Sequence, residues 1–301
     1  MTRPAPLRSI EALLRRLHAR SGLARSVLAA PLALRARLGG QDGHLRMAVA
    51  QQASQRIVGD VLLAMPEFMG QFHCSPRSDL FKVTVAEGGF ETGFADLLRR
   101  HLDPARDFVD VGANIGFYTV LAAKLLPGRR VLAIEPTAGA FARLEANLAL
   151  NGVAGQVTAF KGAASDRPGE VTIHAIAGME EFSSLGPIIH DAAAGQTVIT
   201  EEVPADTVDA LVARHGLDPG MIKIDVEGAE GQVLAGAQAT LERHRPVVLS
   251  ELSRALLEPM GSSPEAIIAR FRALDYQVID AIDPALAPGL RAQGEVLCLP
   301  R

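Results

Sequence analysis

From about residue 80 to the end of the chain, short apolar segments alternate with longer amphipathic ones. The apolar segments have the length of buried strands: 107–112 (DFVDVG), 130–136 (RVLAIEP), 221–226 (MIKIDV) and 246–252 (PVVLSEL). The segments between them carry apolar residues at three- and four-residue spacing, which predicts helices. Buried strands joined by amphipathic helices form parallel sheets that are covered on both faces. The sequence therefore predicts an α/β fold.

The remaining segments complete this pattern. Further strands are expected at 80–85, 157–163, 170–176, 276–282 and 295–300. Helices are expected at 94–102, 115–126, 140–152, 207–216, 231–244 and 263–274. Residues 8–38 are predicted to form one or two helices and residues 46–70 another, whereas residues 177–197 have the composition of a loop. In such sheets, ligands bind beyond the carboxyl ends of the strands.

Charge is distributed unevenly along the 301 residues. Residues 1–46 contain nine arginines and only two acidic residues, while the whole chain has a net charge of −4. The rest of the chain is therefore acidic, which argues against nucleic-acid binding. The two cysteines are too few for a disulfide framework and favour a reducing, cytoplasmic setting. No apolar run is long enough to span a membrane.

The loop Asp110-Val-Gly112-Ala-Asn114-Ile-Gly116 joins the strand at 107–112 to the next helix. Gly112 permits a tight turn, and Gly116 allows close packing at the start of the helix. Asn114 stands where a dinucleotide fingerprint has its second glycine, which disfavours a pyrophosphate and hence a nicotinamide-dependent oxidoreductase.

Glu135 ends the next strand, about twenty residues further on, where an acid can accept hydrogen bonds from the hydroxyls of a ribose. Asp110 lies directly before the loop and could hold a cationic group. A ligand that has a ribose and an ammonium group but no pyrophosphate is S-adenosylmethionine, and this pairing of acids therefore predicts it as the cofactor.

The segment MIKIDVEGAE (221–230) carries three acids at the end of a strand. Alternation along the strand places Lys223 and Asp225 on one side, where Lys223 can keep a carboxylate ionised. Asp225 is the first candidate for a general base, with Glu227 as an undecided second. Glu230 is interpreted as a residue of the following helix start.

Glu251 ends the neighbouring strand and is expected to face Asp225 or Glu227. Three such carboxylates could hold a magnesium ion. In α/β enzymes that hold a metal ion at this strand end, an Asp-Asn pair stands where this chain has Ser250-Glu251-Leu252. We therefore expect no metal, with the magnesium site as the alternative.

Five blocks in order resemble the FkbM family of S-adenosylmethionine-dependent methyltransferases: DVGANIGFYT, AIEP, LEANLALNG, IKIDVEGAE and LERHRPVVLSEL. The resemblance extends from about residue 85 to residue 281. It implies a class I methyltransferase (Rossmann-like) fold, with a seven-stranded sheet whose last strand is antiparallel, and O-methylation of a hydroxyl. We expect residues 76–301 to form this domain and residues 1–75 a helical N-terminal extension.

The resemblance also implies site residues. The residues expected to contact the cofactor are Asp110, Gly112, Ala113, Asn114, Gly116, Glu135, Pro136, Ala164, Ser165 and Asp225. Among these, Ala164 and Ser165 are expected near the adenine. The residues expected to act on the acceptor are Asp225, Lys223, Glu227 and Glu251. Ser183 and Ser184 lie in the loop 177–197, which is either a lid over the acceptor or a solvated loop.

The sequence leaves the acceptor open. The resemblance implies a hydroxyl-bearing small molecule or glycan, such as a sugar or secondary metabolite. An N-methyltransferase acting on a small amine and an inactive binding protein of the same fold are the alternatives. The basic arm, residues 1–46, either packs on its own domain or a second subunit, or contacts anionic lipids at the inner face of a membrane.

Overall fold

The structure, a computed structural model, describes residues 27–28, 43–179, 182–186, 188, 195–289 and 293–301. Apart from Val27–Leu28, which form the short strand β1, the helices predicted over 8–38 lie outside these residues. The chain divides into two units, residues 1–91 and 92–301, each of which is considered separately. In the described residues, no helix combines the length and apolar character needed to cross a membrane.

The first unit contains a small sheet as well as helices, and the prediction of a helix over 46–70 is wrong beyond Ser54. Its elements are α3 (Gly43–Ser54), β2 (Val61–Met65), η1 (Pro66–Phe68), β3 (Gly70–Cys74) and α4 (Asp79–Glu87). β2 pairs in parallel with β1 and antiparallel with β3. In β2, alternate residues are buried, which is the period of a strand rather than of a helix.

The predicted strand at 80–85 is also wrong, because these residues belong to helix α4. The Ser78 side chain caps the helix by accepting a hydrogen bond from the Phe81 N–H, and Gly88 ends it in the left-handed conformation. The buried residues Leu80, Phe81, Thr84 and Val85 recur at three- and four-residue spacing. Over six residues, such a face is hard to distinguish from the alternation of a strand.

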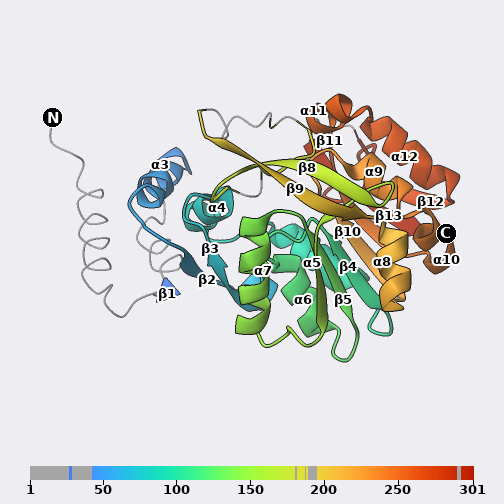
Figure 1. Cartoon of the computed structure of the whole chain (residues 1–301), viewed down its shortest axis with the longest axis horizontal. Coiled ribbons are helices and arrows are strands. Elements are labelled where there is room, and N and C mark those ends of the chain that lie inside the picture. The colour runs from blue at the N-terminus through green and yellow to red at the C-terminus, as the bar shows by residue number, and fades with distance from the viewer. Residues whose placement is uncertain (1–26, 29–42, 180–181, 187, 189–194, 290–292) are drawn as a thin grey trace. The chain divides into compact units, whose positions relative to one another are not determined.

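The second unit is built on a seven-stranded sheet (Figure 1). In spatial order its strands are β12 (Tyr276–Asp280), β13 (Gln293–Pro300), β11 (Val247–Ser253), β10 (Pro219–Ile224), β4 (Asp107–Val111), β5 (Val131–Glu135) and β6 (Val157–Lys161). β13 is antiparallel to both of its neighbours, and the pairs from β11 through β6 are parallel. The predicted fold class, including the antiparallel last strand, is confirmed.

Helices cover both faces of this sheet. One face packs its apolar side chains against α8 (Val208–His215), α9 (Glu230–Ala235), α10 (Gln238–His244) and α12 (Pro264–Ala273). On the other face, α6 (Phe117–Leu125) bonds to β4 through Thr119 and Asp110, and α5 (Thr92–His101) and α7 (Ala138–Leu150) contact α6 and β6, respectively. Figure 1 shows α6 and α7 to one side of β4 and β5, and α8 to the other. Side chains on alternate positions of β4 and β10 therefore point toward α6.

A second, three-stranded sheet has the order β7 (Ala163–Ala164), β9 (Val198–Asp206), β8 (Gly169–Ile176). β8 was predicted, whereas β9 was missed. Residues 198–206 (VITEEVPAD) are mostly exposed toward their N-terminal end, and they contain two glutamates and a proline. Such a strand is specified by its antiparallel pairing with β8 rather than by an apolar pattern of its own.

The helix predicted over 231–244 is interrupted, so that α9 and α10 are separate helices. Gly236 lies at the interruption, and a Cβ atom at this position would lie 2.0 Å from the Ser165 carbonyl oxygen. The Gly236 carbonyl accepts a hydrogen bond from the Asp209 N–H at 2.9 Å. The helix therefore breaks where its backbone meets the segment that follows β6.

Candidate active site at the ends of β4, β5 and β10

Backbone hydrogen bonds join the ends of three neighbouring strands. The Asp225 N–H, just beyond β10, donates to the Val111 carbonyl at 3.0 Å, and the Gly112 N–H donates to the Ile134 carbonyl at 3.0 Å. Gly112 has a φ of 80°, and a Cβ atom there would lie 1.8 Å from the Asp225 carbonyl oxygen. Only glycine fits this position, because the end of β10 occupies the space of a side chain.

Asp110 is the innermost acid of the site and is 1% exposed. The Thr119 hydroxyl of α6 donates to its Oδ2 at 2.6 Å, whereas its buried Oδ1 has no hydrogen-bond partner among the described residues. Burial raises the pKa of this carboxyl, and the nearby Lys223 ammonium opposes that shift. An unsatisfied buried carboxylate oxygen is costly, so Asp110 can accept a hydrogen bond from a ligand.

Glu135 ends β5 and is 4% exposed. Its Oε1 accepts hydrogen bonds from the N–H and hydroxyl of Thr137, at 2.9 and 2.7 Å. Its Oε2 accepts one from the Asn114 N–H at 2.9 Å, and Asn114 has a left-handed φ of 48°. Burial raises the pKa of Glu135 to about 7, although these hydrogen bonds favour the charged form. Since a carboxylate offers roughly four lone-pair sites, about one remains for a ligand.

Lys223 and Asp225 form an ion pair, as their alternation along the strand predicted. Lys223 Nζ lies 2.9 Å from Asp225 Oδ2 and 4.7 Å from the ring centre of Tyr118 in α6. Burial disfavours ionisation of Asp225, but the Lys223 charge and hydrogen bonds from Glu251 and Lys223 outweigh it, so its pKa lies below the ordinary value. Since its pKa is lowered, the Asp225 carboxylate is ionised at neutral pH. Because 33% of its side chain is accessible to solvent, a ligand can reach it.

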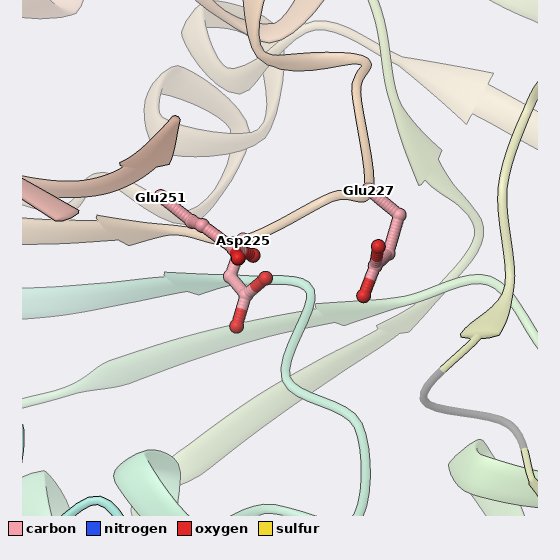
Figure 2. Close-up of side chains that lie close together, drawn as sticks. All are labelled: Asp225, Glu227 and Glu251. Atoms are coloured by element: carbon pink, nitrogen blue, oxygen red, sulfur yellow. The ribbon is translucent and has the colours of Figure 1, made fainter. Parts of the chain in front are cut away.

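Glu227 and Glu251 converge on Asp225 from two different segments. Figure 2 shows the Glu251 side chain, from β11, extending toward Asp225, while Glu227 reaches in from the turn after β10. One ligand atom from each of the three residues lies within 4.8 Å of the others. The expectation that Glu251 faces Asp225 is confirmed.

Glu230 begins α9, as predicted, and is 2% exposed. Its Oε1 accepts hydrogen bonds from the Val226 and Gly228 N–H groups, both at 3.3 Å. The Ser184 hydroxyl reaches the same turn and donates to the Glu227 carbonyl at 3.0 Å. Ser184 thus contacts backbone at the acidic turn, whereas residues 180–181, 187 and 189–194 of the same predicted loop lie outside the described residues.

The other predicted cofactor residues surround this group to different extents. Ala113 is buried, and its N–H donates to the Ile134 carbonyl; Gly116 directly precedes α6; Pro136 is half-buried beside Glu135. Ala164 and Ser165 lie beyond the end of β6, where the Ser165 carbonyl oxygen lies close to the backbone of Gly236. The role of these last two residues near an adenine stays a prediction.

Three residues that support the site were not identified from the sequence: Thr119, Thr137 and Tyr118. Tyr118 and Thr119 are polar-tipped side chains in the helix FYTVLAAKL, whose first seven residues are all buried. A hydroxyl on a wholly buried turn requires a partner, and that requirement is the signal that could have located them.

A family model described as "Methyltransferase FkbM domain" matches residues 110–278, more than half of the chain. The 31-O-demethyl-FK506 methyltransferase FkbM of Streptomyces tacrolimicus is 29% identical over 214 residues, which cover 62% of this chain and 78% of that protein. The AMB antimetabolite synthetase AmbE of Pseudomonas aeruginosa is 32% identical over 181 residues. These cover 49% of this chain but only 8% of the synthetase.

Among solved structures, the methyltransferase FkbM from Methylobacillus flagellatus KT is similar with a TM-score of 0.44 and 15% identity. The match covers 84% of this chain and 58% of that one. The O-methyltransferase from Bacillus cereus in complex with SAH has a TM-score of 0.43 and 14% identity, with 86% and 100% covered. The residues matched by the family model include all the acids described above.

Proposed function

Because the chain belongs to the FkbM family of S-adenosylmethionine-dependent methyltransferases, we propose that it methylates a hydroxyl of a small-molecule acceptor, such as a sugar, glycan or secondary metabolite. The relative from Streptomyces tacrolimicus is named for O-methylation of 31-O-demethyl-FK506, a reaction of this class. The observation that carries the proposal is the ionised Asp225 carboxylate, paired with Lys223 and beside Glu251, next to the Gly112 loop.

The residues at the strand ends fit S-adenosylmethionine. The unpartnered Asp110 Oδ1 can accept a hydrogen bond from its ammonium group, and the free lone-pair site of Glu135 can accept one from a ribose hydroxyl. Asp110 lies in β4, the strand next to β10, and Glu135 ends β5, the strand after it, so both acids lie to the same side of β10 in the sheet. When bound, the cofactor supplies a methyl group already activated on a positively charged sulfur.

The residues of this chain then have two tasks. With the cofactor held by Asp110 and Glu135, they would orient the acceptor oxygen toward the methyl group, which would pass to that oxygen while the cofactor departs as a neutral thioether. Asp225 accepts the proton of the acceptor hydroxyl, because it is ionised, partly exposed and placed at the end of β10. Lys223 keeps Asp225 charged until that proton arrives.

A two-step experiment tests this function. Calorimetry should first show that the wild type and Asp225→Asn bind S-adenosylmethionine with similar affinity; no binding at high micromolar cofactor would remove the enzyme claim. Transfer of a radioactive methyl group is then measured to matched pairs of acceptors, each an alcohol and the corresponding amine. We expect transfer to alcohols that Asp225→Asn loses. Transfer confined to the amines would identify an N-methyltransferase instead, and turnover near wild type in Asp225→Asn would show that Asp225 is not the base.

A further inference from the structure

The turn that carries Glu227 has an unfavourable backbone conformation. Glu227 has a φ of 51°, in the left-handed region that residues with a Cβ atom rarely adopt. Its side chain nevertheless belongs to the group formed with Asp225 and Glu251 (Figure 2). Strained backbone of this kind persists only where surrounding contacts hold it, and it concentrates at functional sites.

Two side chains hold this turn from opposite sides. The Glu230 carboxylate accepts hydrogen bonds from the N–H groups directly before and after Glu227, at Val226 and Gly228. The Ser184 hydroxyl donates to the carbonyl of Glu227 itself. The peptide group that follows Glu227 is therefore held at both its carbonyl oxygen and its N–H, by side chains that are themselves buried, with 2% of Glu230 and 6% of Ser184 exposed.

Ser184 is in turn anchored elsewhere. Its backbone forms two hydrogen bonds with His174 of β8, both at 2.9 Å, and its hydroxyl also accepts one from the Gly186 N–H at 3.0 Å. Ser184 therefore connects the β8–β9 sheet to the turn after β10. Glu230, which begins α9, connects the same turn to the helix that follows it.

We propose that Glu230 and Ser184 are positioning residues, which hold Glu227 in its left-handed conformation so that its carboxylate lies with Asp225 and Glu251. The inference rests on the methyl-transfer function proposed for this site. Neither residue touches the acceptor in this role; both act through Glu227. Glu230 thus has a second role beyond the start of α9, and Ser184 serves the acidic turn rather than an acceptor hydroxyl.

Crystal structures of the variants test the inference without an acceptor. In Glu230→Ala and in Ser184→Ala, we expect Glu227 to leave the left-handed region and its carboxylate to move away from Asp225. Glu230→Gln keeps an oxygen acceptor and should preserve the turn. Ser263→Ala is the matched control, because it removes a serine cap at α12 without touching the turn. An unchanged Glu227 conformation in both alanine variants would overturn the proposal; if Glu230→Ala does not fold, Ser184→Ala decides.

A double-mutant cycle separates positioning from a merely structural role. With an acceptor from the methyl-transfer panel, Glu230→Ala and Ser184→Ala should each lower kcat by up to about 100-fold, the scale of a 1 Å misplacement. The affinity for S-adenosylhomocysteine should stay near that of the wild type. In a Glu227→Ala background, neither substitution should lower kcat further. The inference would be overturned if the losses in kcat of the single variants add in full in the double variants, or if Glu227→Ala has wild-type kcat. If no acceptor is found, that result counts against the proposed function. The crystal structures would then still decide the positioning role.

Discussion

Lys223 Nζ lies 2.9 Å from Asp225 Oδ2, and only 8% of the lysine side chain is accessible to solvent. The pair stands between Asp110, whose Cα is in register with that of Lys223 across β4 and β10, and the Tyr118 ring. One buried cation thus faces acids on two strands, and its removal would leave their negative charges without compensation.

Lys223→Met should therefore destabilise the protein by about 3 kcal/mol, at the lower end of the range for broken buried pairs, because solvent reaches part of Asp225. Lys223 lowers the pKa of Asp225, so the ion pair stabilises the folded protein fully above the unfolded-state pKa of Asp225, which is about 3.9. This stabilisation is lost as the pH falls through the lower pKa of Asp225 in the folded state. Urea unfolding should thus show a smaller difference between variant and wild type at pH 3 than at pH 7. Lys124→Met, on the same face of the sheet in α6, is the control.

Gly112→Ala and Gly128→Ala form a matched pair, because both glycines have a φ near 80°. At Gly128 a Cβ atom would meet nothing within 4 Å, so alanine should cost only the backbone strain of about 1–2 kcal/mol. At Gly112 the same atom would displace the Asp225 carbonyl, which should add about 2 kcal/mol and weaken cofactor binding. Denaturant unfolding and calorimetry with S-adenosylhomocysteine measure both effects. Equal costs at the two positions would contradict the close approach of β10 to the loop.

Glu135 should make the protein less stable as pH rises from about 4.5 to about 7. Burial raises its pKa from 4.5 to about 7 in the folded state, so over this interval the folded chain holds a proton that the unfolded chain has lost. The full effect is roughly 3 kcal/mol, and Glu230, whose pKa burial also raises to about 7, adds a similar amount. Thermal unfolding at pH 5 and pH 7.5 should show the decline, and Glu135→Gln should reduce it. If the stability of Glu135→Gln declines as much as that of the wild type, the pH dependence arises from other groups.

Methyl transfer should persist in EDTA and should not increase with added magnesium. The three acids Asp225, Glu227 and Glu251 have the separation of a ligand set, but Lys223 already supplies a positive charge to Asp225. The measurement is turnover of the active acceptor before and after dialysis against EDTA. A loss that magnesium restores would instead indicate that these carboxylates hold a metal ion.

The strands and helices that could be predicted are those whose own sequence shows a clear apolar pattern. The core strands β4, β5, β10 and β11 are buried along most of their length and mainly apolar, because helices cover both of their faces. The secondary structure of residues 80–85 was predicted wrongly and that of residues 198–206 was missed, for opposite reasons. The first is a buried helix too short to show its period, and the second is an exposed strand whose pairing partner determines it.

The candidate site shows the same division. Strand ends and alternation were sufficient to bring Lys223, Asp225 and Glu251 together, because both follow from the geometry of a parallel sheet. The contacts of Thr119 with Asp110 and of Ser184 with Glu227 could not be read in this way. They depend on which turn of a helix or loop faces a strand end, and this is decided by packing between distant segments.

The approach of Gly236 to the Ser165 carbonyl restricts how this protein can be recombined with its relatives. Residues 162–166 and the junction of α9 and α10 are about seventy positions apart in sequence, yet there is no space between their backbones for even a methyl group. A chimera that exchanges the segment after β6 alone would join two surfaces shaped for different partners. Exchanges that transfer both segments together should give folded proteins more often than exchanges of either one.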